Sequence, residues 1–122
     1  MSVKPSTQDV LAVANACIEP IVELTTRLTE IPAPTNDEGQ RAAAVRQEME
    51  RLGFSRVTED ELHDIVGVIP GKDSSKCLLL AAHIDTVFPR HVDLTVTRDG
   101  DVLRGPGIGD NTLSVASALM LI

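Results

Sequence analysis

An unbroken apolar run, residues 77–82, is the feature that most constrains how this chain can fold. A half-exposed strand alternates apolar and polar residues, whereas a continuous apolar run suits a strand that is covered on both faces. Strands of this kind lie at the centre of sheets flanked by helices. The run therefore predicts an α/β fold in which residues 77–82 form a central strand.

Helical spacing dominates the chain before this run. Over residues 7–30 apolar positions recur every three or four residues, which predicts a helix with one buried stripe. Pro20 removes a backbone donor inside it, so either the helix kinks there or a second helix starts with Pro20 in its first turn. The prolines that follow predict an extended connector over residues 31–34.

The next helix has the clearest boundaries in the sequence. Thr35 and Glu38 form a capping-box pattern at its start, and its apolar stripe continues to residue 52. Gly53 suits the left-handed position that ends many helices, and Phe54 is expected to fold back as its apolar companion.

Short β segments are expected around the central strand. They are rich in β-branched residues and bounded by turn-forming residues, and Asp99-Gly100 predicts a tight hairpin turn. The predicted strands are residues 54–58, 65–69, 77–82 and 92–97, with a return strand beginning at 102–103, and the last predicted helix is 112–122. The expected fold is an α/β/α layer domain with a mostly mixed sheet.

The last predicted helix carries a signal of its own. Residues 114–122 are nearly all apolar or small, which predicts a helix buried on most sides, and the sequence shows no C-cap signal after them. We therefore expect residues 1–122 to form an incomplete domain, the N-terminal portion of a larger one.

Composition excludes several classes of partner. Eleven Lys and Arg against eighteen Asp and Glu give a net charge of −7, which excludes an electrostatic nucleic-acid binder and disfavours a polybasic membrane-surface protein. No stretch approaches the roughly 18 apolar residues of a membrane span. Cys17 and Cys77 match no metal or redox spacing, so we expect buried free thiols in a reducing, cytoplasmic compartment.

The first candidate site directly follows the predicted central strand. His83 and Asp85 lie at its carboxyl end, where open α/β sheets place their ligand sites. Residues two apart in an extended segment point to the same side, so Asp85 can accept the imidazole N–H and leave the other ring nitrogen free for a metal. The alternative is a structural pair, in which the carboxylate only satisfies the histidine.

The second candidate is a glycine-rich elbow, residues 105–111, that opens the last predicted helix. A dinucleotide-binding loop requires glycine where Asp110 stands, and a carboxylate there repels phosphate, so the pattern argues against a nucleotide. Either Asp110 only caps the helix, or the glycines turn the backbone sharply and deliver this carboxylate into a site.

The two motifs together resemble those of the co-catalytic zinc peptidases of the glutamate carboxypeptidase and aminoacylase family. The motifs are His-x-Asp-Thr-Val at residues 83–87 and Gly-Pro-Gly-Ile-Gly-Asp-Asn at residues 105–111. Tripeptide aminopeptidases, acetylornithine deacetylase and succinyl-diaminopimelate desuccinylase are relatives. The resemblance continues through residues 31–35, the helix that contains Glu38, and residues 52–54 and 68–71.

The resemblance implies a site with two zinc ions, for which cobalt or manganese can substitute. By this resemblance His83 is a ligand of one ion, and Asp110 is the carboxylate that bridges both. A cis peptide bond is implied between Asp110 and Asn111. Asp85 is implied as the catalytic-site residue that orients His83. Thr112 stands where many members have Lys, a departure from the family pattern.

The same resemblance implies the reaction. Members of this family hydrolyse an amide bond with water activated by zinc and a general-base Glu. That Glu, the remaining ligands and an inserted dimerisation domain are expected beyond Ile122. We therefore expect a full-length homodimer that hydrolyses a small peptide or N-acyl amino acid, while this chain, with part of the metal site, is inactive alone. The alternative is a non-catalytic partner or regulatory chain on the same fold.

The other polar candidates favour structural roles. His63 lies among acidic turn residues and His91 lies beside Arg90, so both histidines are expected to be solvated. Ser114 and Ser117 lack the strand-to-helix elbow that presents a serine nucleophile.

Overall fold

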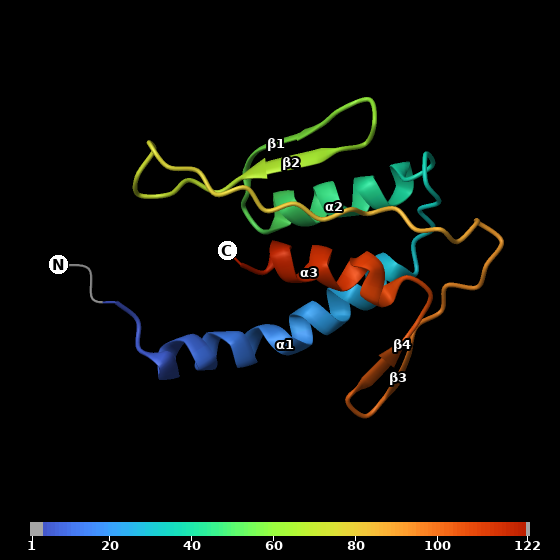
Figure 1. Ribbon diagram of the computed structural model, residues 1–122, viewed down its shortest axis with the longest axis horizontal. Helices are drawn as coiled ribbons and strands as arrows, with labels where there is room; N and C mark the ends of the chain where they lie inside the picture. The colour runs from blue at the N-terminus through green and yellow to red at the C-terminus, as the bar shows by residue number, and fades with distance from the viewer. Residues whose placement is uncertain (1–3, 122) are drawn as a thin grey trace.

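The computed structural model describes residues 4–121, and three helices dominate it (Figure 1). In Figure 1, α3 lies between α1 and α2. The helices are α1 (Thr7–Thr29), α2 (Gly39–Arg51) and α3 (Leu113–Leu119), and a short irregular helical segment, η1 (Ile108–Thr112), precedes α3. Two antiparallel pairs complete the fold: β1 (Ser55–Glu59) with β2 (Ile65–Val68), and β3 (Thr97–Asp99) with β4 (Val102–Arg104).

The core lies where the three helices meet. It is built from aliphatic side chains, in keeping with a chain that has two Phe and no Tyr or Trp. Full burial of one such side chain is worth about 1.5–3 kcal/mol, so this cluster is the main apolar contribution to stability. Its buried members are Leu24, Leu28, Val45, Val115, Ala116 and Leu119.

α1 is one continuous helix with Pro20 inside it, so no second helix begins there. A capping box that the sequence analysis overlooked starts it: Ser6 Oγ accepts from the Asp9 amide at 3.2 Å, and the Asp9 carboxylate accepts from the Ser6 amide at 2.9 Å. The buried residues all lie toward its C-terminal end, from Leu24 to Thr29.

The predicted capping box at the start of α2 is wrong. The Thr35 hydroxyl donates instead to Oδ2 of Asp85 at 2.6 Å, and the Glu38 carboxylate accepts from the Asn36 amide at 2.6 Å. A carboxylate 50 residues away in the sequence therefore takes the hydroxyl that local reasoning assigned to the helix. The predicted connector 31–34 has no helical structure, and Pro34 lies in an isolated β-bridge, as its prolines predicted, whereas Thr35 and Asn36 form a turn.

The predicted end of α2 is confirmed. Gly53 has φ +85°, and its amide donates to the Glu50 carbonyl at 3.2 Å. The Phe54 amide donates to the Met49 carbonyl at 3.0 Å. These two bonds form a Schellman motif, and the side chains of Phe54 and Met49 meet over Gly67 of β2.

The predicted β segments 54–58 and 65–69 and the return strand at 102–103 are confirmed with shifted ends, and the segment 92–97 is mostly wrong. β1 and β2 form an antiparallel pair, and β3 and β4 form the hairpin predicted at Asp99-Gly100. Of the predicted strand 92–97, only Thr97 lies in a strand. The Asp93 carboxylate accepts from the amide and the hydroxyl of Thr95. These local hydrogen bonds compete with the backbone hydrogen bonds that a paired strand would make.

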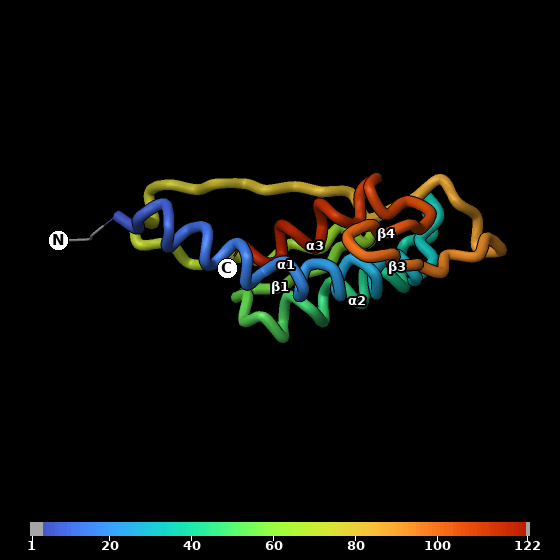
Figure 2. The backbone as a smooth tube through the Cα atoms, turned by 90° about the horizontal axis from the view of Figure 1, so that it is seen from below, coloured from blue at the N-terminus to red at the C-terminus, as the bar shows by residue number. Residues whose placement is uncertain are grey.

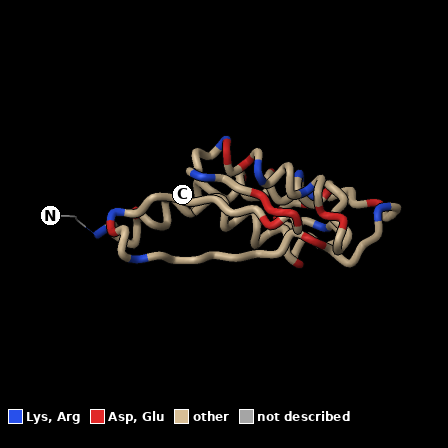
Figure 3. Tube along the Cα trace, turned by 90° about the horizontal axis from the view of Figure 1, so that it is seen from above, with Lys and Arg blue, Asp and Glu red and all other residues tan. Residues whose placement is uncertain are grey.

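The predicted central strand does not form. Residues 77–82 run in an extended line across one side of the helices, with no strand paired to them among residues 4–121 (Figure 2). Leu78 and Leu79 are each 82% exposed, and no charged side chain interrupts the run (Figure 3). The predicted mixed sheet is also wrong, because a covered strand needs partners from elsewhere in the chain and the described residues supply none.

Two further expectations are corrected. α3 is buried along one face only, since Val115, Ala116 and Leu119 are buried while Leu113 is exposed. Both thiols are free, as predicted, but Cys17 is half-buried and Cys77 is exposed. Within residues 4–121, each helix is too short or too polar to cross a membrane.

Candidate metal centre

The two sequence motifs meet at His83. Its Nε2 lies 3.0 Å from Oδ1 of Asp110, and its Nδ1 lies 3.1 Å from Oδ1 of Asp85. Asp85 comes from the same extended segment, whereas Asp110 comes from η1 and is 27 residues away in the sequence. The imidazole is thus held between two carboxylates, one at each ring nitrogen.

Asp85 is the more firmly held of the two carboxylates. The Thr35 hydroxyl donates to its Oδ2 at 2.6 Å. This hydrogen bond lowers the pKa of Asp85, partial burial opposes the effect, and the neighbouring His83 adds to it. Because an ionised carboxylate can only accept hydrogen bonds, Nδ1 is the donor of the His83–Asp85 pair. Nε2 faces the Asp110 carboxylate, where a bound cation would take the place of a proton between the two groups.

Backbone hydrogen bonds anchor the segment that carries His83 and Asp85, residues 83–86, which we call the site segment. The Thr86 amide donates to the Ala33 carbonyl at 2.8 Å, and the Thr35 amide donates to the Thr86 carbonyl at 3.3 Å. Pro34 and Thr86 form an isolated parallel bridge. The connector between α1 and α2 therefore serves as a short strand partner for the site segment.

A buried arginine completes this anchor. Arg41 of α2 is 2% exposed, and its guanidinium donates to backbone carbonyls of Thr29 at 3.2 Å, Ile31 at 2.7 and 3.1 Å, and Ile84 at 2.8 Å. The first two carbonyls lie at the C-terminal end of α1, where the helix dipole favours a cation. Burial lowers the pKa of Arg41, and the negative charge of Asp85 opposes that shift.

The glycine-rich elbow brings Asp110 to the site segment. Gly107 has φ +73°, and a Cβ on it would lie 2.9 Å from Cγ2 of Thr86, so the elbow packs directly against the site segment. The peptide bond between Asp110 and Asn111 is cis, as the resemblance implied. α3 begins only at Leu113 and has no side-chain cap, so the interpretation of Asp110 as an N-cap fails.

The donors at this site suit part of a zinc centre. An imidazole nitrogen and a carboxylate converge, which is the donor chemistry of catalytic zinc, and Asp85 holds the other ring nitrogen of His83 as outer partners of such ligands do. The side chains of His83 and Asp110 are 51% and 90% exposed, so the site is open. Three protein ligands are usual, and residues 4–121 contain no group of three or more His, Cys, Asp or Glu side chains suited to a metal.

Sequence reasoning missed two residues of this arrangement, Thr35 and Arg41. Thr35 was assigned to a local cap, and no local signal separates the two roles. Arg41 did leave a signal, because it lies four residues before the buried Val45 and therefore on the buried stripe of α2. A charged residue on an apolar stripe indicates a specific polar partner.

The two histidines outside the site differ from each other. His91 is exposed, as expected. His63 is not merely solvated, because its Nδ1 lies 2.8 Å from Oε1 of Glu59 and its ring packs against Gly39 at the start of α2. It therefore links the turn between β1 and β2 to α2.

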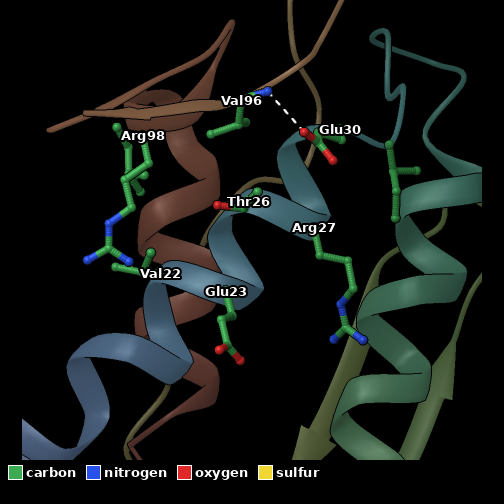
Figure 4. A pocket seen from close by; sticks show the side chains of 9 residues that line it. Val22, Glu23, Thr26, Arg27, Glu30, Val96 and Arg98 are labelled. Carbon is green, nitrogen blue, oxygen red and sulfur yellow. Dashed lines mark hydrogen bonds between the residues drawn. The ribbon is translucent and has the colours of Figure 1, made fainter. Parts of the chain in front are cut away.

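A groove lies elsewhere, between α1 and the β3–β4 hairpin (Figure 4). Its volume is about 630 Å³. The Glu30 carboxylate accepts from the Val96 amide at 3.0 Å, and Arg98 pairs with Glu19 at 2.7 and 2.8 Å, so the hairpin is tied to α1. None of the candidate site residues lines this groove.

Comparison with known proteins gives one family match. Residues 64–122 match the model of peptidase family M28, a family of zinc-dependent peptidases. The matched region is just under half of the chain and contains both motifs of the candidate centre. No curated protein matches the chain. The match supports a zinc-dependent metallopeptidase in general, and it does not confirm the glutamate carboxypeptidase and aminoacylase family, to which the matched family is related.

Proposed function

We propose that this chain contributes part of a zinc centre that hydrolyses an amide bond in a small peptide or an N-acyl amino acid. The observation that carries the proposal is the 3.0 Å approach of His83 Nε2 to Asp110, with Asp85 on the opposite ring nitrogen. The family match supports the general class of activity. The substrate and the share of the site that this chain supplies are our own inference.

Each residue of the centre has a separate role in this proposal. His83 offers Nε2 as a neutral donor, since Asp85 accepts from its Nδ1 and holds the ring in one orientation. Asp110 offers a carboxylate with two oxygens, which two cations can share. A zinc ion bound here would supply Lewis-acid activation of an amide carbonyl.

We further propose that other residues complete the site. The two ligands on this chain are fewer than the three usual at a catalytic zinc, and residues 4–121 contain no group of three or more side chains suited to a metal. The resemblance implies that the general-base Glu also lies outside these residues. The remaining ligands, the general-base Glu and a dimerisation domain would then belong to parts of a cytoplasmic homodimer that these 122 residues do not contain. Two zinc ions, or cobalt or manganese in their place, would be bound.

Metal analysis and kinetics on three variants test this proposal. In the complete protein, Asp110→Asn keeps the size of the side chain, yet a neutral amide cannot balance two dications, so metal content should fall and activity should nearly vanish while the fold survives. His83→Ala should remove one ion preferentially. Asp85→Asn should keep the ions more nearly in place but lower affinity or rate by roughly 10- to 100-fold.

The exposed His91 provides the matched control, since His91→Ala removes an imidazole outside the site. This variant should keep full activity and both metals. Full activity and two metals in Asp110→Asn would overturn the proposal.

The 122-residue chain by itself should not hydrolyse dipeptides or N-acyl amino acids above background, with or without added zinc. The reason is its incomplete ligand set and the missing general base. Turnover by the pure chain that a chelator abolishes would show that these residues suffice, and the proposed division of the site would be wrong.

A further inference from the structure

Two contacts on the site segment come from outside both sequence motifs. The Arg41 guanidinium donates to the carbonyl of Ile84, the residue between His83 and Asp85, at 2.8 Å. The Thr35 hydroxyl donates to the Asp85 carboxylate at 2.6 Å. One contact therefore holds the backbone of the site segment, and the other holds one of its side chains.

Arg41 is an unusual buried charge, because its hydrogen-bond partners are backbone carbonyls and none is a carboxylate. Burial of a charge is costly unless its donors are satisfied. Three carbonyls satisfy them, two at the end of α1 and one on the site segment. Loss of the Ile84 carbonyl would leave Nη1 without its acceptor, so the guanidinium holds the site segment at a set distance from α1.

The consequence for the site follows from the geometry of an extended chain. His83 and Asp85 are two residues apart and lie on the same side. The Ile84 carbonyl belongs to the peptide plane that joins Ile84 to Asp85, so its bond to Arg41 sets the orientation of that plane. Thr35 then selects the orientation of the Asp85 carboxylate, which contacts His83 Nδ1 through its other oxygen. Without these two contacts the His83–Asp85 pair would be held by the backbone bonds of Thr86 and by the contacts with the glycine-rich elbow.

We propose that Arg41 and Thr35 are positioning residues of the candidate metal centre: Arg41 holds the backbone between His83 and Asp85, and Thr35 holds the Asp85 carboxylate against His83 Nδ1. This inference rests on the proposed function for its purpose, but the contacts can be tested without metal or substrate. Neither residue touches the converging donor atoms of His83 and Asp110 in the structure.

Thr35 gives the cleanest test, because it is exposed and its replacement should not unfold the chain. Nitrogen-15 NMR of the neutral imidazole distinguishes the Nδ1–H tautomer from the Nε2–H tautomer. We expect the Nδ1–H form of His83 to dominate in the wild-type chain, because Thr35 holds Asp85 in place whereas the Asp110 side chain is 90% exposed. Thr35→Val should lower its population, because the Asp85 carboxylate loses its orienting donor, and Thr35→Ser should restore it because the hydroxyl is retained.

Arg41→Lys tests the backbone contact, with Arg46→Lys on the exposed side of α2 as the matched control. A lysine keeps the charge but cannot reach three carbonyls at once. Amide hydrogen exchange at Thr86 should accelerate about 10- to 100-fold, the equivalent of one lost charged hydrogen bond. Exchange at Phe54, near the far end of α2, should change much less, whereas a merely structural role would accelerate both amides equally.

The outcomes separate this inference from the proposed function. An unchanged His83 tautomer in Thr35→Val, or equal acceleration at Thr86 and Phe54 in Arg41→Lys, would overturn the positioning role whatever the metal results. If Arg41→Lys does not fold, the comparison of Thr35→Val with Thr35→Ser still tests the positioning role. If the tautomer and exchange effects appear but no complete form of the protein binds zinc, the positioning role stands and the proposed function fails.

Discussion

At the residue scale, the buried charges of the described chain, Arg41 and Glu48, both lie on α2 and are handled in different ways. Arg41 is surrounded by carbonyls. Glu48 is paired with two arginines whose own side chains are mostly exposed: Arg51 and Arg27 each approach its carboxylate to 2.5 Å. Both arrangements satisfy a buried ion, but only the first connects α2 to the candidate metal centre.

The ionisation of Glu48 should make the free energy of unfolding depend on pH. The Arg51 hydrogen bond lowers its pKa in the folded protein, burial opposes this, and Arg27 adds to it. A lowered folded-state pKa means that the stabilisation is full above the unfolded-state value of about 4.3 and is lost as the pH falls through the folded-state pKa. Glu48→Gln should lower the free energy of unfolding by about 1–3 kcal/mol at pH 7 and reduce its decline in acid, measured by urea unfolding from pH 7 to pH 3.

Glu50 is the matched control for this experiment. It lies on the same helix, pairs with Arg46 and is about half exposed, so Glu50→Gln should change stability by no more than about 0.5 kcal/mol. An acid dependence of Glu48→Gln identical to that of the wild type would contradict the assignment.

Gly107 should be intolerant of a side chain. Alanine there would be held at φ +73°, with its Cβ 2.9 Å from Cγ2 of Thr86, so the elbow would have to move away from the site segment. Gly107→Ala should cost about 1–3 kcal/mol and shift the NMR signals of His83. Gly109→Ala is the control, because a Cβ there meets nothing within 4 Å. Equal effects of the two substitutions would show that the contact with Thr86 has no importance.

At the scale of elements, α1 is one continuous helix through Pro20, but its N-terminal part is exposed and its C-terminal part is buried. Residues 7–16 are exposed on every side, whereas residues from Leu24 to Thr29 pack into the core. Figure 2 shows the N-terminal part of α1 extending away from the other helices. An isolated helical segment of this length is marginal in water even with a good cap.

We therefore expect the backbone amides in the two halves of α1 to differ in their protection from hydrogen exchange. Amides of residues 11–18 should exchange with solvent at least ~10-fold faster than those of residues 24–29, because their opening does not disturb the core. Ser6→Ala should accelerate the first group further and leave the second unchanged, since it removes only the capping box. Uniform protection along α1 would mean that the first half is covered, as by association.

At the scale of the whole molecule, most of the extended run 77–82 is uncovered within residues 4–121 (Figure 2): residues 77–81 are exposed, and only Ala82 packs against the core. The run is apolar, exposed and without strand partners. Such a surface combines two causes of association, an apolar patch and unpaired strand edges.

The chain should therefore self-associate with rising concentration. Leu79→Lys should shift sedimentation toward the monomer, because a charge opposes edge-to-edge pairing. Leu62→Lys is the control: Leu62 is 77% exposed, comparable to the 82% of Leu79, but it lies in the turn between β1 and β2. A wild-type chain that stays monomeric at high concentration, or an equal effect of both substitutions, would contradict this prediction.

The features that the sequence alone determined are those whose hydrogen bonds close within a few residues. Helical spacing predicted α1 and α2, Gly53 predicted the Schellman motif, and Asp99-Gly100 predicted a hairpin. The same local patterns singled out His83, Asp85 and Asp110 as candidates, because each follows a turn-forming or strand-like signal. The two-residue spacing also predicted the contact of Asp85 with His83. The approach of Asp110, 27 residues away, was implied only by the family resemblance.

Tertiary structure decided everything that depends on a distant partner. Residues 77–82 have the composition of a covered strand, yet a strand exists only where another segment supplies its ladder. Thr35 could cap a helix or bind a carboxylate, and the nearness of Asp85 determined which. Arg41 became an anchor because the end of α1 and the carbonyl of Ile84 converge on it. The physical reason is that a helix satisfies its backbone locally, whereas strands, buried charges and metal ligands are satisfied only by residues that folding brings together.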